Sequence, residues 1–216
     1  VLQSLQPEII FFNYGPESPS TRIYIHNEPL EFADRNSLQP FFFDYLRQKD
    51  GGVAIMHGHV FEKVGVNIST VHGSFSNEFR KQIPGAEENG LFWASGISVV
   101  SHMCNPHVPA AHMNTRMLVT GKGDKKKIWF GGGSDLTPTF NDIESSNIFH
   151  QDLESMCDKY DKLYYPKFKG WCDEYFYLPH REEPRGVGGI FLDYLCNENW
   201  EKDFSFIQDI GSTFLS

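Results

Sequence analysis

A series of strand-forming segments with no helical segment between them is the feature that most limits how this chain can fold. Five segments are predicted as strands from their Val, Ile and aromatic content: residues 53–61, 64–72, 94–103, 110–120 and 126–130. The first two are expected to meet in a turn around Glu62–Gly65, and the third and fourth are joined through Asn105–Pro109. Because strands joined by short connections pair in opposite directions, we expect an antiparallel sheet.

Apolar residues at helical spacing dominate the chain after this region. They recur at Phe149, Leu153, Met156, Cys157, Tyr160 and Tyr164, then at Phe168, Cys172, Tyr175 and Phe176, and finally at Phe204, Ile207, Ile210 and Phe214. A further helix is predicted between Asn36 and Gly51, with Pro40 in its first turn. The sequence therefore predicts a single α+β domain in which the sheet comes first and the helices follow.

Composition limits the partners of the protein. The 216 residues are 40% hydrophobic and 15% aromatic, which suffices for a well-filled core, and carry a net charge of −9. Such an acidic chain is not expected to bind nucleic acid or an anionic membrane, and no apolar run is long enough for a membrane span. Four cysteines without a CxxC pair predict free or buried thiols, and the start at Val1 lacks a signal-peptide pattern. We expect a soluble cytoplasmic protein.

Three polar residues alternate along the predicted strand 110–120. His112, Asn114 and Arg116 lie two residues apart, which places them on one face of a strand. Such a face suits an anionic organic substrate, because arginine binds a carboxylate, asparagine orients it and histidine transfers a proton. The alternative interpretation is an ordinary solvent-exposed strand face.

A glycine run precedes a carboxylate further along the chain. Gly131–Gly133 lacks the GK[ST] ending of a phosphate-binding loop, so we expect a strand end where backbones approach closely. Asp135 follows this run, and Arg185 lies in a second glycine-rich stretch, Pro184–Gly189. These positions are candidate site residues because bulky side chains do not cover the backbone around them.

Histidines are numerous for an acidic chain, which raises the question of a metal. His102, His112, His150 and His180 are separated in sequence and bind a shared metal only if the fold brings them together. No HExxH motif and no Cys/His finger occurs. The alternative is that these histidines are hydrogen-bonded residues of the core or the rim.

Several long motifs together resemble one family, the oxygen-dependent coproporphyrinogen III oxidases of haem biosynthesis. The matching stretches are Val60–Ser69, Gly96–His102, Pro109–Arg116, Trp129–Pro138, Tyr165–Lys169, Trp171–Phe176 and Pro184–Phe191. They occur in the family's order from about residue 51 to the end. We therefore predict a divergent N-terminal segment, residues 1–45, followed by an oxidase-like domain, residues 46–216, that lacks the family's C-terminal segment.

The resemblance implies the fold and the reaction. The fold would be a large antiparallel sheet flanked by helices on both faces, assembled as a homodimer. The reaction would be oxidative decarboxylation of two propionates of coproporphyrinogen III to vinyl groups, giving protoporphyrinogen IX, carbon dioxide and hydrogen peroxide. Dioxygen would be the co-substrate, with no organic cofactor, because electron-rich pyrroles react with it directly; a divalent metal is a further possibility.

The resemblance also assigns roles to residues. His112 would donate a proton and Asp135 would lie near the pyrrole nitrogens, making these two the catalytic residues. Substrate-binding residues would be Ser98, Asn114, Thr115, Arg116 and Arg185. A metal, if used, would be bound by His102, His112, His150 and His180.

Two hypotheses from other classes remain open. The chain could be a catalytically impaired paralogue or fragment that binds tetrapyrroles on the same fold, although His112, Arg116 and Asp135 are all present. It could also be a metal-dependent oxygenase that uses two histidines and Asp135 as ligands. The exposed apolar face expected on an incomplete C-terminal helix would then favour association or aggregation.

Overall fold

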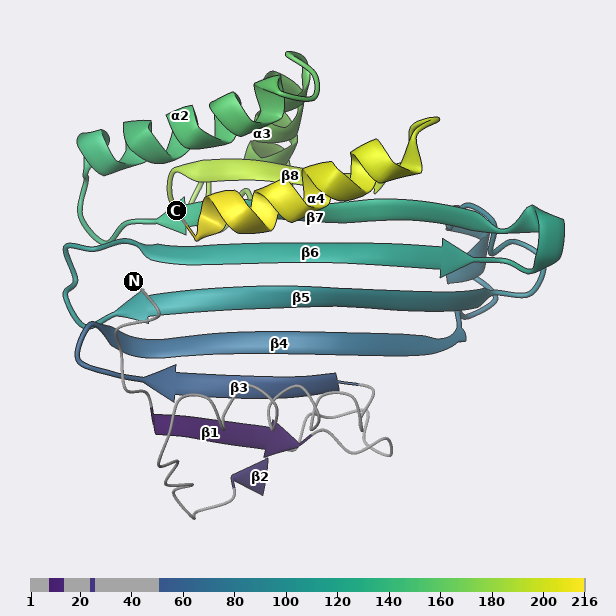
Figure 1. The fold of residues 1–216 in the computed structure, drawn as a ribbon, viewed down its shortest axis with the longest axis horizontal. Helices are drawn as coiled ribbons and strands as arrows, with labels where there is room; N and C mark the ends of the chain where they lie inside the picture. The colour runs from purple at the N-terminus through teal and green to yellow at the C-terminus, as the bar shows by residue number, and fades with distance from the viewer. Residues whose placement is uncertain (1–7, 14–23, 26–50, 216) are drawn as a thin grey trace.

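The computed structural model describes residues 8–13, 24–25 and 51–215 of the chain. The helix predicted between Asn36 and Gly51 lies outside these residues. The described segments form one eight-stranded sheet with helices packed against it (Figure 1). The predicted α+β single-domain fold is confirmed.

Every pair of neighbouring strands in the sheet is antiparallel, as predicted. The order across the sheet is β2-β1-β3-β4-β5-β6-β7-β8, so each strand from β3 onward lies beside the next one in the chain. The strands are β1 (Glu8–Asn13), β2 (Tyr24–Ile25), β3 (Gly51–His57), β4 (Phe61–Ser74), β5 (Leu91–Met103), β6 (Ala110–Thr120), β7 (Lys127–Thr137) and β8 (Gly188–Leu195).

Two predictions about strand positions were wrong. The turn between β3 and β4 falls at residues 58–60, where the Gly58 amide donates to the Phe61 carbonyl at 2.9 Å, and Glu62–Gly65 belongs to β4. Val64 is 1% exposed, so burial of this side chain favours a strand over a turn at its position. The glycines at 131–133 lie inside β7 rather than at its end.

Strand β8 was missed by the sequence analysis. It lies between two helices in the chain and forms the edge of the sheet beside β7. Its sequence begins with glycines and continues as a short apolar run, Ile190–Leu192, which periodicity alone cannot assign to a strand. The predicted order of sheet first and helices afterwards is therefore corrected by this strand.

The two faces of the sheet differ in chemistry. One face, called the core face here, carries buried apolar side chains including Val64, Val99, Met113, Phe130 and Leu192. The opposite face, called the site face, carries His112, Asn114 and Arg116 on β6, with Gly131, Gly133 and Asp135 directly opposite them on β7. Because paired residues in an antiparallel sheet point to the same side, the strand register gathers the polar residues on one surface.

Three α-helices complete the fold: α2 (Ile143–Asp158), α3 (Tyr164–Tyr175) and α4 (Trp200–Phe214). Side-chain caps begin two of them, since Asp142 accepts from the Ser145 amide and Asn199 accepts from the Lys202 amide. Helix α4 buries Phe206, Ile207 and Ile210, three members of the core cluster. The apolar side of this helix thus faces the core.

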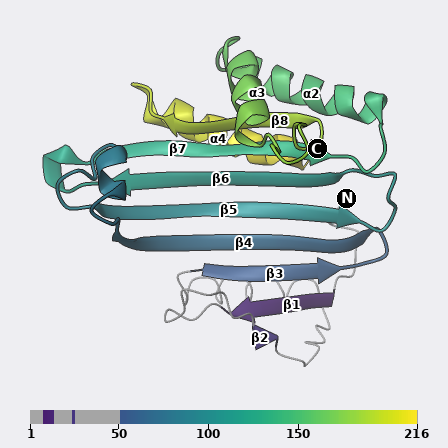
Figure 2. The same cartoon turned by 180° about the vertical axis from the view of Figure 1, so that it is seen from behind.

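Helices α3 and α4 lie on different sides of the β8 edge. Helix α4 is in front of β7 and β8 in Figure 1, and α3 is in front of β8 when the molecule is seen from behind in Figure 2. Phe168 of α3 still contacts Phe206 of α4, with ring centroids 5.9 Å apart, whereas Tyr175 stacks on Phe191 of β8 at 4.1 Å. Helix α3 therefore starts beside the core and brings its last turn over the site face.

The remaining composition-based predictions concern cysteines and membranes. All four cysteines are free; Cys157 and Cys172 are buried, and Cys104 and Cys196 are exposed. This agrees with the prediction of thiols. Among the described residues, no helix is both long enough and apolar enough to cross a membrane.

Candidate active site

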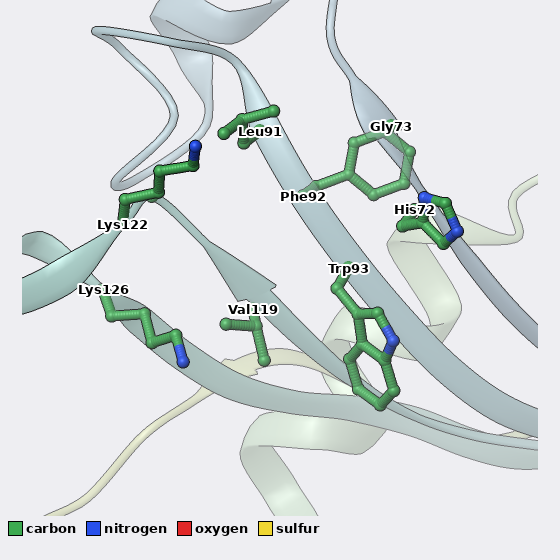
Figure 3. Close-up of a pocket in the computed structure, with 9 residues that line it drawn as sticks. His72, Gly73, Leu91, Phe92, Trp93, Val119, Lys122 and Lys126 are labelled. Carbon is green, nitrogen blue, oxygen red and sulfur yellow. The ribbon is translucent and has the colours of Figure 1, made fainter.

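Two pockets on the described part of the molecule are candidate sites. The larger, about 420 Å³, lies near the hairpin ends of β4–β7 (Figure 3). Leu91, Trp93 and Val119 line it together with Lys122 and Lys126. Its lining includes His72 but no carboxylate, so it offers no imidazole–carboxylate pair. The second pocket does have such a pair.

The second pocket, about 200 Å³, is formed on the site face by β6, β7, β8 and the end of α3. Its lining residues are His112, Asn114, Arg116, Gly132, Gly133, Asp135, Tyr175, Phe176, Ile190 and Phe191. Four of the residues selected from the sequence, His112, Asn114, Arg116 and Asp135, thus line one cavity. We take this pocket as the candidate active site.

A chain of charged and polar side chains forms one wall of the pocket. His112 Nδ1 lies 2.8 Å from Asp135 Oδ1, and Arg185 Nε donates to Asp135 Oδ2 at 3.1 Å. The Asp135 side chain is only 5% exposed, while His112 and Arg185 are each about one third exposed. A carboxylate accepts from Nδ1–H, so Asp135 holds the imidazole with Nε2 available for proton exchange.

A second polar group surrounds Arg116. Arg116 Nη1 donates to Asn114 Oδ1 at 3.0 Å, and Arg116 Nη2 donates to Asp193 Oδ2 at 2.9 Å. Arg116 is 27% exposed and lines the pocket, and its partner Asp193 is 24% exposed and lies beside it. The guanidinium keeps further N–H donors for an anionic ligand.

Aromatic side chains form the opposite wall. Tyr175 stacks on Phe191 with an interplanar angle of 15°, and Phe176 meets Phe191 edge to face. The Arg185 guanidinium lies 3.7 Å from the centroid of the Phe176 ring, a cation–π contact that fixes the arginine beside Asp135. An apolar wall facing cations suits a ligand with a flat apolar body and carboxylate arms.

The other two predicted substrate-binding residues on β5 and β6 lie on opposite faces of the sheet. Ser98 pairs with Asn114 across β5 and β6, so it lies on the site face next to the pocket. Thr115 is 9% exposed and points to the core face beside Met113. Its side chain therefore does not line the pocket, because neighbouring residues of a strand point to opposite sides.

The four histidines predicted to share a metal are not gathered in the structure. Both ring nitrogens of His150 have partners, with Nε2 3.0 Å from the Val187 carbonyl oxygen and Nδ1 3.0 Å from the Tyr165 hydroxyl. His102 and His180 are exposed, and His112 contacts Asp135. Within the described ranges no three His, Cys, Asp or Glu side chains are close enough to hold a metal ion. The histidines are therefore not assembled into a three-ligand site among the described residues, and both metal hypotheses remain predictions.

Several lining or supporting residues were not selected as site residues from the sequence. Tyr175 and Phe176 were predicted as apolar helix positions, and Ile190, Phe191 and Asp193 lie on the strand that was missed. The available signal was the alternation of Phe191 and Asp193 after Gly189, which places all three on one strand face.

An imidazole oriented by a buried carboxylate, beside an arginine and an aromatic wall, is typical of an enzyme that transfers protons on an anionic organic substrate. Comparison with known proteins identifies the family. A sequence model of the family described as coproporphyrinogen III oxidase matches residues 28–216. The oxygen-dependent coproporphyrinogen-III oxidases of Rickettsia rickettsii (strain Sheila Smith) and Rickettsia bellii (strain OSU 85-389) are each 54% identical over 191 residues. Each alignment covers 86% of this chain and 67% of the relative.

The chain therefore belongs to the coproporphyrinogen III oxidase family and is an oxidoreductase. The match begins at residue 28, within the segment that the sequence analysis separated as residues 1–45. The proposed boundary between that segment and the domain 46–216 remains a prediction.

Proposed function

We propose that this protein catalyses the oxygen-dependent oxidative decarboxylation of coproporphyrinogen III to protoporphyrinogen IX in haem biosynthesis. The observation that carries the proposal is the site-face pocket, in which the His112–Asp135 pair and Arg116 lie opposite an aromatic wall. The substrate has a tetrapyrrole body and carboxylate arms, which match these two walls. The names of the relatives support both the substrate and the oxidant.

The balance of the reaction shows what the protein must supply. Each propionate loses its carboxylate as carbon dioxide and a hydrogen from the methylene carbon attached to the pyrrole. This leaves a vinyl group and releases two electrons. Dioxygen accepts those electrons and becomes hydrogen peroxide, with net consumption of one proton per propionate. The protein therefore has to bind the carboxylates, keep the reacting arm in place and exchange protons.

His112 is the residue we assign to proton exchange. Asp135 accepts from its Nδ1 side at 2.8 Å, which leaves Nε2 as the exchanging atom. Arg185 keeps the buried Asp135 carboxylate from being an isolated charge. Asp135 is accordingly a positioning residue for His112 as well as a candidate for stabilising positive charge on a pyrrole.

Substrate carboxylates are assigned to the arginines of the site face. Arg116 borders the pocket with N–H donors beyond those used by Asn114 and Asp193. Arg185 lies behind the pocket, held by Asp135 and Phe176, and Ser98 extends the polar surface along β5. Thr115 can contribute only through its backbone, because its side chain is on the core face.

Dioxygen is the proposed co-substrate, and the proposal needs no organic cofactor because the propionate arms of the substrate supply the electrons and dioxygen accepts them. No step is assigned to a metal, since the four candidate histidines are not gathered in the structure. We further propose a homodimer in the cytoplasm, in line with the resemblance and the acidic composition.

Coproporphyrinogen III is the substrate with which to test the proposal. Purified protein would be incubated with it aerobically and anaerobically, and the products would be oxidised and measured by porphyrin fluorescence. We expect protoporphyrin only in the aerobic reaction, with carbon dioxide released in proportion. Binding of the tetrapyrrole without turnover would support the impaired paralogue instead, and anaerobic turnover would contradict the use of dioxygen.

A further inference from the structure

The Arg116–Asp193 ion pair has no part in the proposed proton transfer, yet three features of β6, β7 and β8 maintain it. Asp193 approaches Arg116 across the width of β7, with Nη2 and Oδ2 2.9 Å apart. Its other oxygen, Oδ1, accepts from the Tyr194 amide at 3.0 Å, which fixes the carboxylate in orientation. Both partners lie on the site face beside the pocket.

A β-bulge in β8 is the first of these features. Phe130 of β7 pairs with Leu195, and Gly132 pairs with Leu192, so Gly131 alone lies opposite Asp193 and Tyr194. Tyr194 takes up the extra residue with a φ of 55°. The bulge lets Leu192 and Leu195 both stay on the core face while Asp193 turns to the site face. The cost of a left-handed tyrosine backbone is thus offset by two buried leucines.

The absence of a side chain at Gly131 is the second feature. A Cβ at this position would lie 2.6 Å from Asp193 Oδ1, 3.0 Å from Arg116 Nε and 3.1 Å from Arg116 Nη2. The ion pair therefore lies directly over the glycine backbone. Any larger residue would displace the two side chains. The three nearest atoms include no backbone atom, so the strands themselves would not have to separate.

Asn114 is the third feature, because it holds the other amino group of the guanidinium at 3.0 Å. With Nη1 and Nη2 each given a partner, the plane of the Arg116 guanidinium is fixed relative to the sheet. A preorganised cation loses less rotamer entropy when a ligand binds than a mobile one does. If Asp193 acted only as a negative charge beside Arg116, it would weaken the binding of an anionic substrate by repulsion.

We propose that Asp193 is a positioning residue that acts through Arg116 to set the binding of a substrate carboxylate, and that Gly131 is retained to make room for this pair. The proposal rests on the proposed function only in taking a tetrapyrrole carboxylate as the ligand. The two effects predict opposite changes in the substrate KM when Asp193 is removed. Loss of positioning raises the KM, whereas loss of charge repulsion lowers it. The structure favours positioning because the bulge, Gly131 and Asn114 all hold the pair together.

The test combines kinetics with ligand binding. We expect Asp193→Ala to raise the KM for coproporphyrinogen III roughly tenfold, as for loss of one charge-assisted hydrogen bond, with kcat within about twofold. Asp193→Asn keeps one acceptor and should give a smaller increase. Gly131→Ala should raise KM like Asp193→Ala, without a large loss of Tm. Glu88→Ala, which removes the partner of Lys125 at an exposed ion pair far along the chain, is the matched control and should leave KM unchanged.

A double-mutant cycle shows whether Asp193 acts through Arg116. In an Arg116→Ala background, Asp193→Ala should no longer weaken binding. The dissociation constant of coproporphyrin III, the stable oxidised tetracarboxylate, is measured for each variant by fluorescence. Absence of turnover in the unmodified protein would remove the proposed function while leaving this binding series to decide the inference. Normal turnover with an unchanged or lower KM in Asp193→Ala would overturn the inference alone.

Discussion

At the scale of single residues, His112 shows how a buried neighbour gives a partly exposed side chain its chemistry. The imidazole is 32% exposed, but its Nδ1 edge rests on a carboxylate that is only 5% exposed. Buried charge is tolerated there because Arg185 supplies the opposite charge 2.9 Å away. Orientation of His112 therefore depends on Asp135, and Asp135 is in turn held by Arg185.

Replacement of His112 tests the assignment of proton exchange. His112→Ala should lower kcat about a hundredfold, the usual contribution of a general acid or base, while Tm changes little because the side chain is partly exposed. Steady-state kinetics and thermal unfolding give the two numbers. His57→Ala, on β3 and separated from β6 by two strands, is the control. A His112→Ala variant with full kcat would remove this residue from the mechanism.

Arg116 should respond differently from His112. Arg116→Lys keeps the positive charge but loses the planar set of donors that Asn114 and Asp193 now hold. We expect KM to rise about tenfold with kcat nearly unchanged, since the lost interaction binds the substrate rather than the transition state alone. Equal affinity for coproporphyrin III in the variant and the unmodified protein would make Arg116 a structural residue.

At the scale of elements, the close contact between β7 and β8 depends on glycines. A Cβ at Gly189 would lie 1.9 Å from the Ser134 carbonyl oxygen, which is backbone of the neighbouring strand. The strands would have to separate, and Asp135 is the residue paired with Gly189. The same glycines that admit β8 to the sheet therefore also fix the position of the Asp135 carboxylate.

Replacement of a glycine by alanine should destabilise the protein where the position is crowded and not where it is open. Gly189→Ala should destabilise the protein by about 1–3 kcal/mol through overpacking and should also lower activity. Gly65→Ala is the matched control, because nothing lies within 4 Å of a Cβ at that position on β4. Denaturant unfolding measures both. Similar stability of the two variants would show that β7 and β8 can separate without cost.

At the scale of the whole molecule, the core between the sheet and the helices protects two thiols. Cys157 of α2 and Cys172 of α3 are both 0% exposed. Burial raises the pKa of each thiol to about 12, and nearby carboxylates, Asp158 for Cys157 and Asp135 for Cys172, act in the same direction. Both groups are therefore held as neutral thiols at neutral pH.

Stability should fall in alkali because of these thiols. Their pKa is raised from 9.0 in the unfolded chain to about 12 in the folded one, so their contribution is complete below pH 9.0 and is lost as pH rises toward 12. Guanidinium unfolding at pH 7 and pH 10.5 (about mid-range) should show a smaller free energy of unfolding at the higher pH. Cys157→Ala and Cys172→Ala should each reduce this difference. A difference that is unchanged in both variants would assign the effect to other groups.

Sequence alone determined much of this protein. The strands from residue 91 to 120 follow from Val, Ile and aromatic content, and α2, α3 and α4 follow from apolar residues at helical spacing. The alternation of His112, Asn114 and Arg116 on one strand face is also a local property, because the two-residue period of a strand needs no knowledge of the partner strands.

Tertiary structure alone decided which distant residues meet. Thr115 was selected with its neighbours, but only burial of the core face shows that its side chain points away from the pocket. Asp193 was not selected, because its contact with Arg116 depends on a bulge in a strand whose pairing with β7 is non-local. The four histidines had compatible chemistry, yet their distances depend on the packing of helices and loops, to which residue spacing gives no access. Local periodicity fixes the face on which a side chain lies; strand pairing and core packing fix what it touches.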